Sequence, residues 1–300
     1  MHTPISRFLF RNIFALLVFA IGPVEALEEE VGDACESYKC NFLKDLKVEV
    51  GYAAGKFIGI KRDYAEYGVF LPVSFLNQWV IFADGRAYQF RHSKWGASGG
   101  LGIRGGGWCD RILGANVYYD CLESRHDKFF KRIGVGVEWL GACWDIRANG
   151  YFPVGSKSHF SKKKVFKFPG GFVSTCRENE FSIGKGFDAE FGLPVWCCDD
   201  LLEVYVAAGP YYYKQRRGEF WGGYGRIEVN LRDYLSIEVR TSHDKIYRTH
   251  TQVRILLSLP FEVLCDWNCF CEYCQNLCLQ PVKRNGIIFT DVCCNSHWNW

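Results

Sequence analysis

The sequence predicts an all-β protein, a transmembrane antiparallel up-and-down β-barrel of about twelve strands. Three observations predict this fold: an export signal at the start of the chain, alternating apolar and polar residues in its middle, and aromatic residues near the ends of those segments. The 300 residues are 48% hydrophobic, yet after the first 30 no run approaches the roughly 20 apolar residues that a membrane helix needs. Alternation in strands therefore has to account for the hydrophobicity.

The N-terminus has the features of a secretory signal peptide. Arg7 and Arg11 flank the start of an apolar stretch, residues 13–21, and small residues precede a cleavage site after Ala26. We expect residues 1–26 to be this signal and 27–44 to form a periplasmic segment; an uncleaved anchor helix is the alternative, but the stretch is short for one. Export implies an oxidising compartment, so the 15 cysteines become candidate disulfides, and their odd number leaves at least one unpaired within the chain.

Short alternating segments recur from residue 45 to residue 261. In the clearest one, Ile133, Val135 and Val137 alternate with two glycines and Glu138, which places them on one face of a strand. A segment of about ten residues, at ~3.3 Å per residue and a tilt of ~45°, climbs roughly 23 Å, which matches the apolar band of an outer-membrane barrel. The predicted strands are 46–54, 65–72, 79–90, 95–104, 111–120, 130–140, 143–152, 181–192, 202–213, 220–231, 235–242 and 248–260.

The two faces of these strands distinguish a membrane barrel from a secreted β-sandwich. Both folds tolerate polar rows of mixed charge, but aromatic residues at strand ends favour the barrel, where they form interfacial girdles. The aromatic residues are Trp79, Trp95, Trp108, Trp139, Trp144, Phe152, Trp221, Tyr234 and Phe261. The charges expected to line the lumen are Glu138, Asp145, Arg147, Asp188, Glu190, Arg226, Glu228, Glu238, Arg240 and Arg254.

The lengths of the predicted connections agree with an outer-membrane orientation. If the first strand leaves from the periplasm, connections after odd-numbered strands face outward and should be the longer ones. The longest, residues 153–180, falls on the outward side and contains Lys162, Lys163, Lys164 and Lys167. Such a cluster is usually a solvated loop, although at the outer surface it is also suited to anionic lipopolysaccharide or host glycans.

Several stretches together resemble the barrel domain of the inverse autotransporters, the intimin and invasin family. They are Leu113–Asp120, then His126, then Arg132–Trp139, Ala148–Pro153 and Gly186–Pro194. The resemblance covers about residues 45–261 and implies a twelve-stranded outer-membrane barrel. It also implies a linker that threads the lumen from the periplasm to an adhesive passenger outside.

The sequence departs from this family after the barrel. Only about 40 residues follow Phe261, too few for one immunoglobulin-like domain of ~100 residues, so adhesion cannot simply be transferred. Residues 262–300 instead form a cysteine-rich tail. We expect no strand at 295–299, where alternation is absent, and we take Phe261 rather than Trp300 as the last aromatic residue of the barrel.

Most cysteines are expected to start on the periplasmic side, which leaves Cys121 and Cys176 outside. They would tie the barrel to itself, to sister barrels or to cysteine-rich envelope proteins. The disulfide candidates are Cys35, Cys40, Cys109, Cys143, Cys197, Cys198, Cys265, Cys269, Cys271, Cys274, Cys278, Cys293 and Cys294. A zinc site around Cys271 and Cys274 is the alternative, but no second CxxC follows and export favours oxidation.

Two classes of function remain open at this stage. The first is an envelope anchor or surface-display protein, which would contact outer-membrane lipid and, through its outward loops, a host surface. The second is a general diffusion porin, because no long linker is expected to plug the mixed-charge lumen. We expect no catalytic residue, metal or cofactor, since acids such as Asp188 and Glu190 should pair with basic residues on the same inner face. The chain has 36 basic and 33 acidic residues, and this near balance does not indicate binding to nucleic acid. The location of the tail, in the lumen, the periplasm or the surface, stays open.

Overall fold

The computed structural model describes residues 46–299 apart from 77–78, 92–93, 107–110, 125–127, 161–163, 168–172, 183–184, 199–201, 216–217, 233 and 261–277. All described residues belong to one structural unit, Cys40–Trp300. The predicted signal peptide and the 27–44 segment lie outside them. No helix in the described part of the chain is long and apolar enough to cross a membrane.

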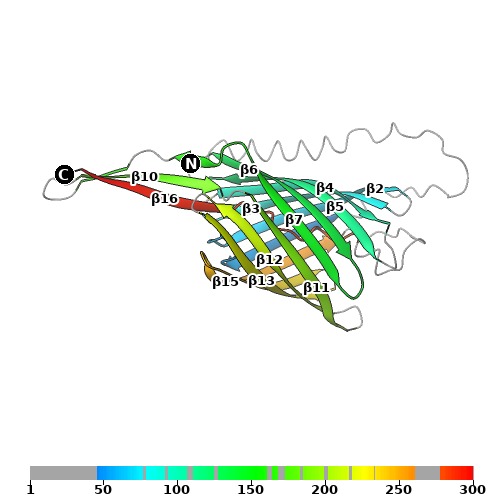
Figure 1. The fold of residues 1–300 in the computed structure, drawn as a ribbon. Helices are drawn as coiled ribbons and strands as arrows, with labels where there is room; N and C mark the ends of the chain where they lie inside the picture. The colour runs from blue at the N-terminus through cyan, green and yellow to red at the C-terminus, as the bar shows by residue number, and fades with distance from the viewer. Residues whose placement is uncertain are drawn as a thin grey trace, which may run out of the picture. The chain divides into compact units, whose positions relative to one another are not determined.

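Twelve antiparallel strands close into a barrel (Figure 1), which confirms the predicted fold class and strand number. Neighbours along the chain pair with each other, and β1 pairs with β15 to close the ring. The barrel strands are β1 (Lys47–Gly55), β2 (Tyr64–Leu76), β3 (Trp79–Phe90), β4 (Lys94–Gly105), β5 (Ile112–Glu123), β6 (Phe129–Leu140), β7 (Asp145–Val154), β11 (Gly186–Cys198), β12 (Leu202–Gln215), β13 (Gly218–Leu231), β14 (Leu235–Asp244) and β15 (Arg248–Pro260).

Alternation along each strand separates an apolar outer face from a polar inner face. In β6 every second residue is buried: Arg132 and Glu138 point inward, whereas Val137 is 59% exposed on the outside. The outer face of the barrel carries the large exposed apolar side chains and the buried polar side chains line the inside. This inside-out distribution suits a barrel that meets lipid and encloses a polar lumen.

The connections differ at the two ends of the barrel. At the end where β1 begins and β15 finishes, which we call the turn end, the connections are 77–78, 106–111, 141–144, 199–201 and 232–234. At the opposite end, which we call the loop end, they are 56–63, 91–93, 124–128, 155–185, 216–217 and 245–247. The longest lies at the loop end, as expected.

The expectations for that longest connection and for the end of the tail were wrong. The connection contains β8 (Ser158–Phe160), β9 (Lys164–Lys167) and β10 (Val173–Ser182), and the tail contains β16 (Thr290–Asn299). Ten residues of β16 pair with all ten of β10, and both strands leave the barrel at its loop end (Figure 1). The sequence analysis did not predict these strands because neither shows the apolar alternation that a lipid-facing strand requires. The structure defines them by their main-chain pairing.

Candidate functional site: the tail inside the lumen

The tail runs through the barrel from the turn end to the loop end. Gln280 lies beside Arg104, near the turn end of β4, whereas Phe289 packs on Tyr213, near the loop end of β12. The expectation that no linker fills the lumen was therefore wrong. About twelve extended residues suffice for this crossing, because an extended chain spans ~3.3 Å per residue.

Three wall arginines hold the main chain of the tail. Arg104 donates to the carbonyl oxygens of Cys278 and Gln280, and Arg86 donates from Nη2 to the carbonyl oxygen of Val282 at 3.3 Å. Arg132 donates from Nη2 to the carbonyl oxygen of Asn285 at 2.6 Å.

Each of these arginines is fixed by a carboxylate of the wall. The partners are Glu138 for Arg104 and Asp120 for Arg132, both at 2.8 Å from the arginine Nε, and Glu66 for Arg86 at 3.0 Å from Nη1. The guanidinium groups are thus held in place before the tail arrives, and they bind backbone groups that any residue offers.

Arg284 is the most tightly held side chain of the tail. Its Nη1 and Nη2 lie 2.9 and 2.7 Å from the two carboxylate oxygens of Asp120, and Nη1 also donates to Ser98 Oγ at 2.9 Å. The guanidinium carbon lies 4.2 Å from the ring centre of Tyr118. The space for it exists because residue 134 is glycine: a Cβ there would lie 2.4 Å from Arg284 Nη2. A bidentate, buried pair of this kind fixes both position and direction.

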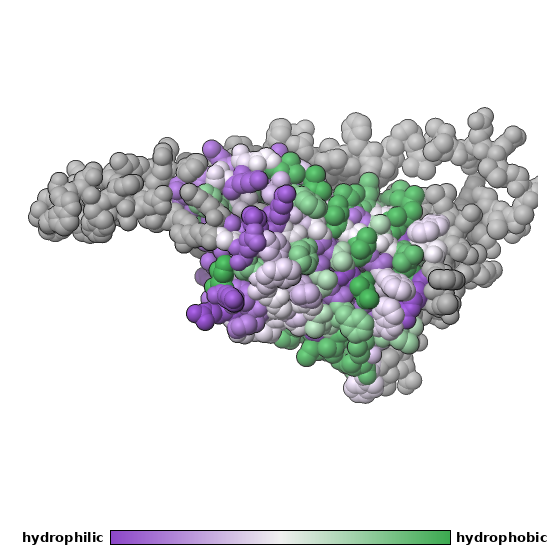
Figure 2. Space-filling model, in the orientation of Figure 1, coloured by the Kyte–Doolittle hydropathy of each residue, from purple (hydrophilic) through white to green (hydrophobic). Residues whose placement is uncertain are grey.

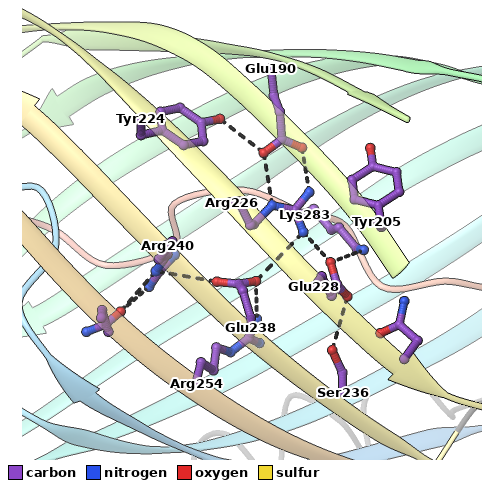
Figure 3. Close-up of polar contacts among 12 residues, drawn as sticks. Glu190, Tyr205, Tyr224, Arg226, Glu228, Ser236, Glu238, Arg240, Arg254 and Lys283 are labelled. Atoms are coloured by element: carbon purple, nitrogen blue, oxygen red, sulfur yellow. Dashed lines mark hydrogen bonds and ion pairs between the residues drawn. The ribbon is translucent and has the colours of Figure 1, made fainter. Parts of the chain in front are cut away.

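Lys283 points to the opposite wall. Its Nζ lies 2.7 Å from Glu228 Oε2, inside a network that joins strands β11 to β15 (Figure 3). Arg226 is at its centre: its Nη2 lies 2.7 Å from Glu190 Oε1, and its other amino group bonds to Glu228. Consecutive tail residues therefore contact opposite sides of the lumen, and the chain is held between them.

An apolar and aromatic cluster closes the lumen at the loop end. Ile287, Ile288 and Phe289 of the tail are buried in it, with the ring centres of Phe289 and Tyr213 at 5.1 Å. The other members are Ala53, Phe57, Ile58, Ile60, Tyr64, Tyr88, Phe90, Leu122, Phe130, Tyr151, Tyr211, Phe220 and Tyr247, with Tyr224 packed against them.

Part of this closure comes from the β1–β2 connection, which folds into the barrel. Phe57 and Ile58 are buried, and the Ile58 amide donates to Ser242 Oγ at 3.4 Å. Gly59 adopts φ +72°, and a Cβ at this position would lie 2.9 Å from Phe289. Only glycine combines that backbone conformation with so close an approach.

A polar cavity of about 180 Å³ lies beside the tail. Its lining runs from Glu203 and Arg232 at the turn end to Phe57 and Ile58 near the loop end, with tail residues along one side. This is room for several water molecules. In the described part of the chain, the cavity ends against the aromatic cluster.

The charges predicted to line the lumen lie on the inner face. Glu138, Asp145, Arg147, Asp188, Glu190, Arg226, Glu228 and Glu238 are buried, and Arg240 and Arg254 are half-buried. Glu190 contacts Arg147 and Arg226, as expected of a paired acid. Asp188 differs from the expectation, because its hydrogen bonds come from Asn149 Nδ2 at 2.9 Å and the Tyr213 hydroxyl at 3.4 Å, which are neutral groups.

Four wall residues that contact the tail were missed. Arg86, Arg104, Asp120 and Arg132 were not among the predicted lumen residues, although each occupies an inward position of an alternating strand. Alternation could have placed them inside. The sequence does not show what they hold, because the three arginines bind the main chain of a distant segment and Asp120 binds the Arg284 side chain, 164 residues away.

The cysteines are divided between the two ends. Cys143 is exposed in a turn-end connection, Cys197 and Cys198 end β11 at the same end, and Cys278 is buried in the lumen. Cys293 and Cys294 belong to β16 beyond the loop end, so they lie at the opposite end of the barrel from Cys143, Cys197 and Cys198. Cys121, Cys143 and Cys278 form no disulfide. The candidates outside the described residues are Cys35, Cys40, Cys109, Cys265, Cys269, Cys271 and Cys274.

No group of three or more His, Cys, Asp or Glu side chains in the described ranges could hold a metal ion. The CxxC at Cys271 and Cys274 lies outside those ranges.

A closed antiparallel barrel with an apolar outside and a charged inside defines a transmembrane β-barrel of the outer-membrane class. Residues 34–168 match the family model of the inverse autotransporter β-domain. The predicted resemblance is confirmed. A search of the curated proteins finds no match.

The chain is similar to several solved structures. A structure described as "Unveiling the Mechanism Behind the in-meso Crystallization of Membrane Proteins" is 17% identical, with a TM-score of 0.53 over 82% of this chain and 99% of that one. The KdgM porin is 6% identical over 71% and 99%, with a TM-score of 0.41. Outer membrane phospholipase A from Escherichia coli is 10% identical over 73% and 98%, with a TM-score of 0.39. At such identity the first likeness concerns the fold alone.

Proposed function

We propose that the protein is a non-enzymatic outer-membrane anchor that carries its own C-terminal segment through the barrel and displays it as β16 at the cell surface. The observation that carries the proposal is the path of residues 278–289 from the turn end to the loop end. The family supports the same role, because an anchor or translocation role suits an inverse autotransporter β-domain.

The charge of the lumen supports the tail as an integral part of the barrel. Buried carboxylates outnumber the arginines of the described barrel wall. Eleven carboxylates are buried, Glu49, Glu66, Asp84, Asp120, Glu138, Asp145, Asp188, Glu190, Glu228, Glu238 and Asp244, and seven arginines are buried or half-buried, Arg86, Arg104, Arg132, Arg147, Arg226, Arg240 and Arg254. Lys283 and Arg284 of the tail add positive charge to this acidic wall. Unpaired buried charges are costly, so a lumen without these cations would be the less stable state.

The orientation follows from the export signal and the connections. We place the turn end, where the exported N-terminal segment meets β1, in the periplasm, and the loop end, with its 31-residue connection, outside. On this orientation Cys293 and Cys294 are extracellular and Cys143 is periplasmic.

Thiol labelling of intact cells tests this arrangement. In a C121S/C176S background, which lacks the other two cysteines at the loop end, a membrane-impermeant maleimide should label intact, reduced cells. Adding C293S/C294S to this background should remove that label. Cys143 provides the matched control, because its label should appear only once the outer membrane is permeabilised. Intact cells in which C293S/C294S changes nothing, while permeabilisation reveals both sites, would contradict the display of β16.

The proposal extends to the periplasmic cysteines, which we expect to link the barrel to sister barrels or to cysteine-rich envelope proteins. Six of the candidates lie before β1 or between the barrel and Cys278, close in sequence to the turn end. Non-reducing electrophoresis of isolated envelopes should show high-mass species that collapse when reductant is added. A band that stays monomeric without reductant would contradict the cross-linking.

We expect the 155–185 connection and β16 to make any contact with a host surface. Cells that express a variant without residues 161–172 should then bind host cells less well, at unchanged surface abundance of the barrel. Equal binding by both strains would contradict this role.

The alternative is a general diffusion porin. The cavity beside the tail favours some hydration, but its end at the aromatic cluster argues against an open path. Planar-bilayer recordings of the full chain distinguish the two functions: a porin conducts steadily, whereas we expect a closed baseline.

A further inference from the structure

The two ends of the barrel differ strongly in charge. The six loop-end connections contain sixteen Lys and Arg residues and four Asp and Glu residues. The five turn-end connections contain two basic and four acidic residues. The near-neutral chain is thus polarised along the barrel axis, with the excess of positive charge at the end that we place outside.

The described side chains show that this charge reaches solvent. Ten exposed cations surround the loop end: Lys56, Lys61, Arg91, Lys128, Lys131, Lys157, Lys185, Lys214, Lys245 and Arg248. They occur in or beside each of the six connections, so they form a ring, which we call the basic rim. Glu219 is the one exposed acid among the described residues there, and it pairs with Lys214 at 2.6 Å.

Some of these cations stand on the lipid-facing side of the strands. Lys131 shares the outer face of β6 with Ile133, Val135 and Val137, and only Phe129 lies nearer the loop end on that face of the strand. Lys185 is likewise exposed and two residues from Phe187, an exposed residue of the outer face of β11. On the outer surface of the barrel, the cations therefore lie next to the apolar band on its loop-end side. In a lipid, the head group lies next to the acyl chains in the same way.

Two of the lysines are neighbours across strands. The amide of Lys214 donates to the carbonyl oxygen of Lys185 at 2.8 Å, next to the Gly186 and Tyr213 pair of the β11–β12 ladder. Like charges directly opposite each other are unfavourable, and Glu219 can neutralise only one of them. An anion between the two ammonium groups would remove this repulsion.

We propose that the basic rim binds the phosphate groups of the phosphorylated glycolipid of the outer leaflet. Lysine and arginine bind phosphate through charge-assisted hydrogen bonds, and basic residues at an anionic membrane surface each strengthen binding about fivefold. Figure 2 shows the hydrophilic surface gathered toward the end from which β10 and β16 leave, with the apolar surface beside it. A soluble polyanion would need the cations but not this continuity with the apolar band, which is why we assign a lipid.

Binding of lipid A to the full chain in detergent micelles tests the assignment. The probes are diphosphoryl lipid A and the same lipid without phosphates, and retained lipid is counted by native mass spectrometry. The K131Q/K185Q/K214Q variant should bind the diphosphoryl form on the order of 100-fold more weakly, because it lacks three cations at about fivefold each. The matched control is R232Q, which removes an exposed cation at the turn end and should bind like the wild type.

The outcomes are distinct. Loss of binding in the triple variant with retention in R232Q and in K131R/K185R/K214R supports the proposal. Equal binding of both lipid forms, unchanged binding by the triple variant, or complete displacement of lipid by inorganic phosphate or heparin at equal phosphate or sulfate concentration would overturn it. The shift of the folded barrel on unheated electrophoresis establishes that each variant is folded, and single variants replace the triple one if it is not.

Discussion

The contact between Arg284 and Asp120 should decide how firmly the tail is held, and Arg284→Gln removes it. Breaking a buried ion pair costs about 3 to 5 kcal/mol when one charge is left behind. Here the Nε of Arg132 remains 2.8 Å from the Asp120 carboxylate, so the lower value, about 3 kcal/mol, applies. A free energy of this size raises the population of the undocked tail on the order of 100-fold.

Hydrogen exchange measures that population directly. In the wild type the Asn285 amide donates to the Tyr151 hydroxyl at 3.1 Å, and peptides covering residues 278–289 should be protected. In R284Q they should exchange about 100-fold faster, while the barrel strands keep their protection. Lys214→Gln is the control, because its pair with Glu219 is exposed and should leave the tail unchanged. Equal tail exchange in R284Q and wild type, with a folded barrel in both, would refute the role of this pair.

Three further predictions concern the fit of the tail. Phe289→Ala leaves a hole beside Tyr213 and should produce intermittent conductance in planar bilayers, whereas the wild type stays closed. Gly59→Val should lower the thermal unfolding temperature and expose the tail to added protease, because its φ of +72° and its contact with Phe289 both exclude a side chain. Gly134→Val should reproduce the faster exchange of R284Q, since a Cβ there takes the place of Arg284 Nη2; normal protection in this variant would contradict that geometry.

The sequence predicted the barrel well because lipid imposes a strong pattern. Every barrel strand has to expose an apolar residue at each second position. The sequence of a segment such as β6 therefore indicates where the strand begins and ends and which of its residues face inward. The β10 and β16 strands meet no such requirement. They pair through main-chain groups beyond the loop end, and no pattern in the sequence of residues 290–299 predicts that pairing.

Only the barrel wall of the site was predictable from the sequence, and the tail that contacts it was not. Inward charges such as Arg226 and Glu238 follow from alternation, but the tail that meets them has no periodicity and lies far away in the sequence. Lys283 is separated by 55 residues from Glu228, and Arg284 by 164 from Asp120. Such contacts arise from closure of the barrel around the chain, which composition and spacing do not encode. The excess of acidic over basic residues on the inner face of the wall was the one available indication of the tail, since an acidic lumen requires a cationic partner.

The contacts of the tail divide into two kinds that differ in what they recognise. Arg104 and Arg86 bind carbonyl oxygens of Cys278, Gln280 and Val282, which lie two residues apart along the tail, and every sequence offers such main-chain groups. Lys283 and Arg284, in contrast, fit their carboxylates at one register only. The first kind of contact therefore holds the chain without selecting its sequence. The second kind fixes the register, so these two residues determine which part of the tail lies at the loop end.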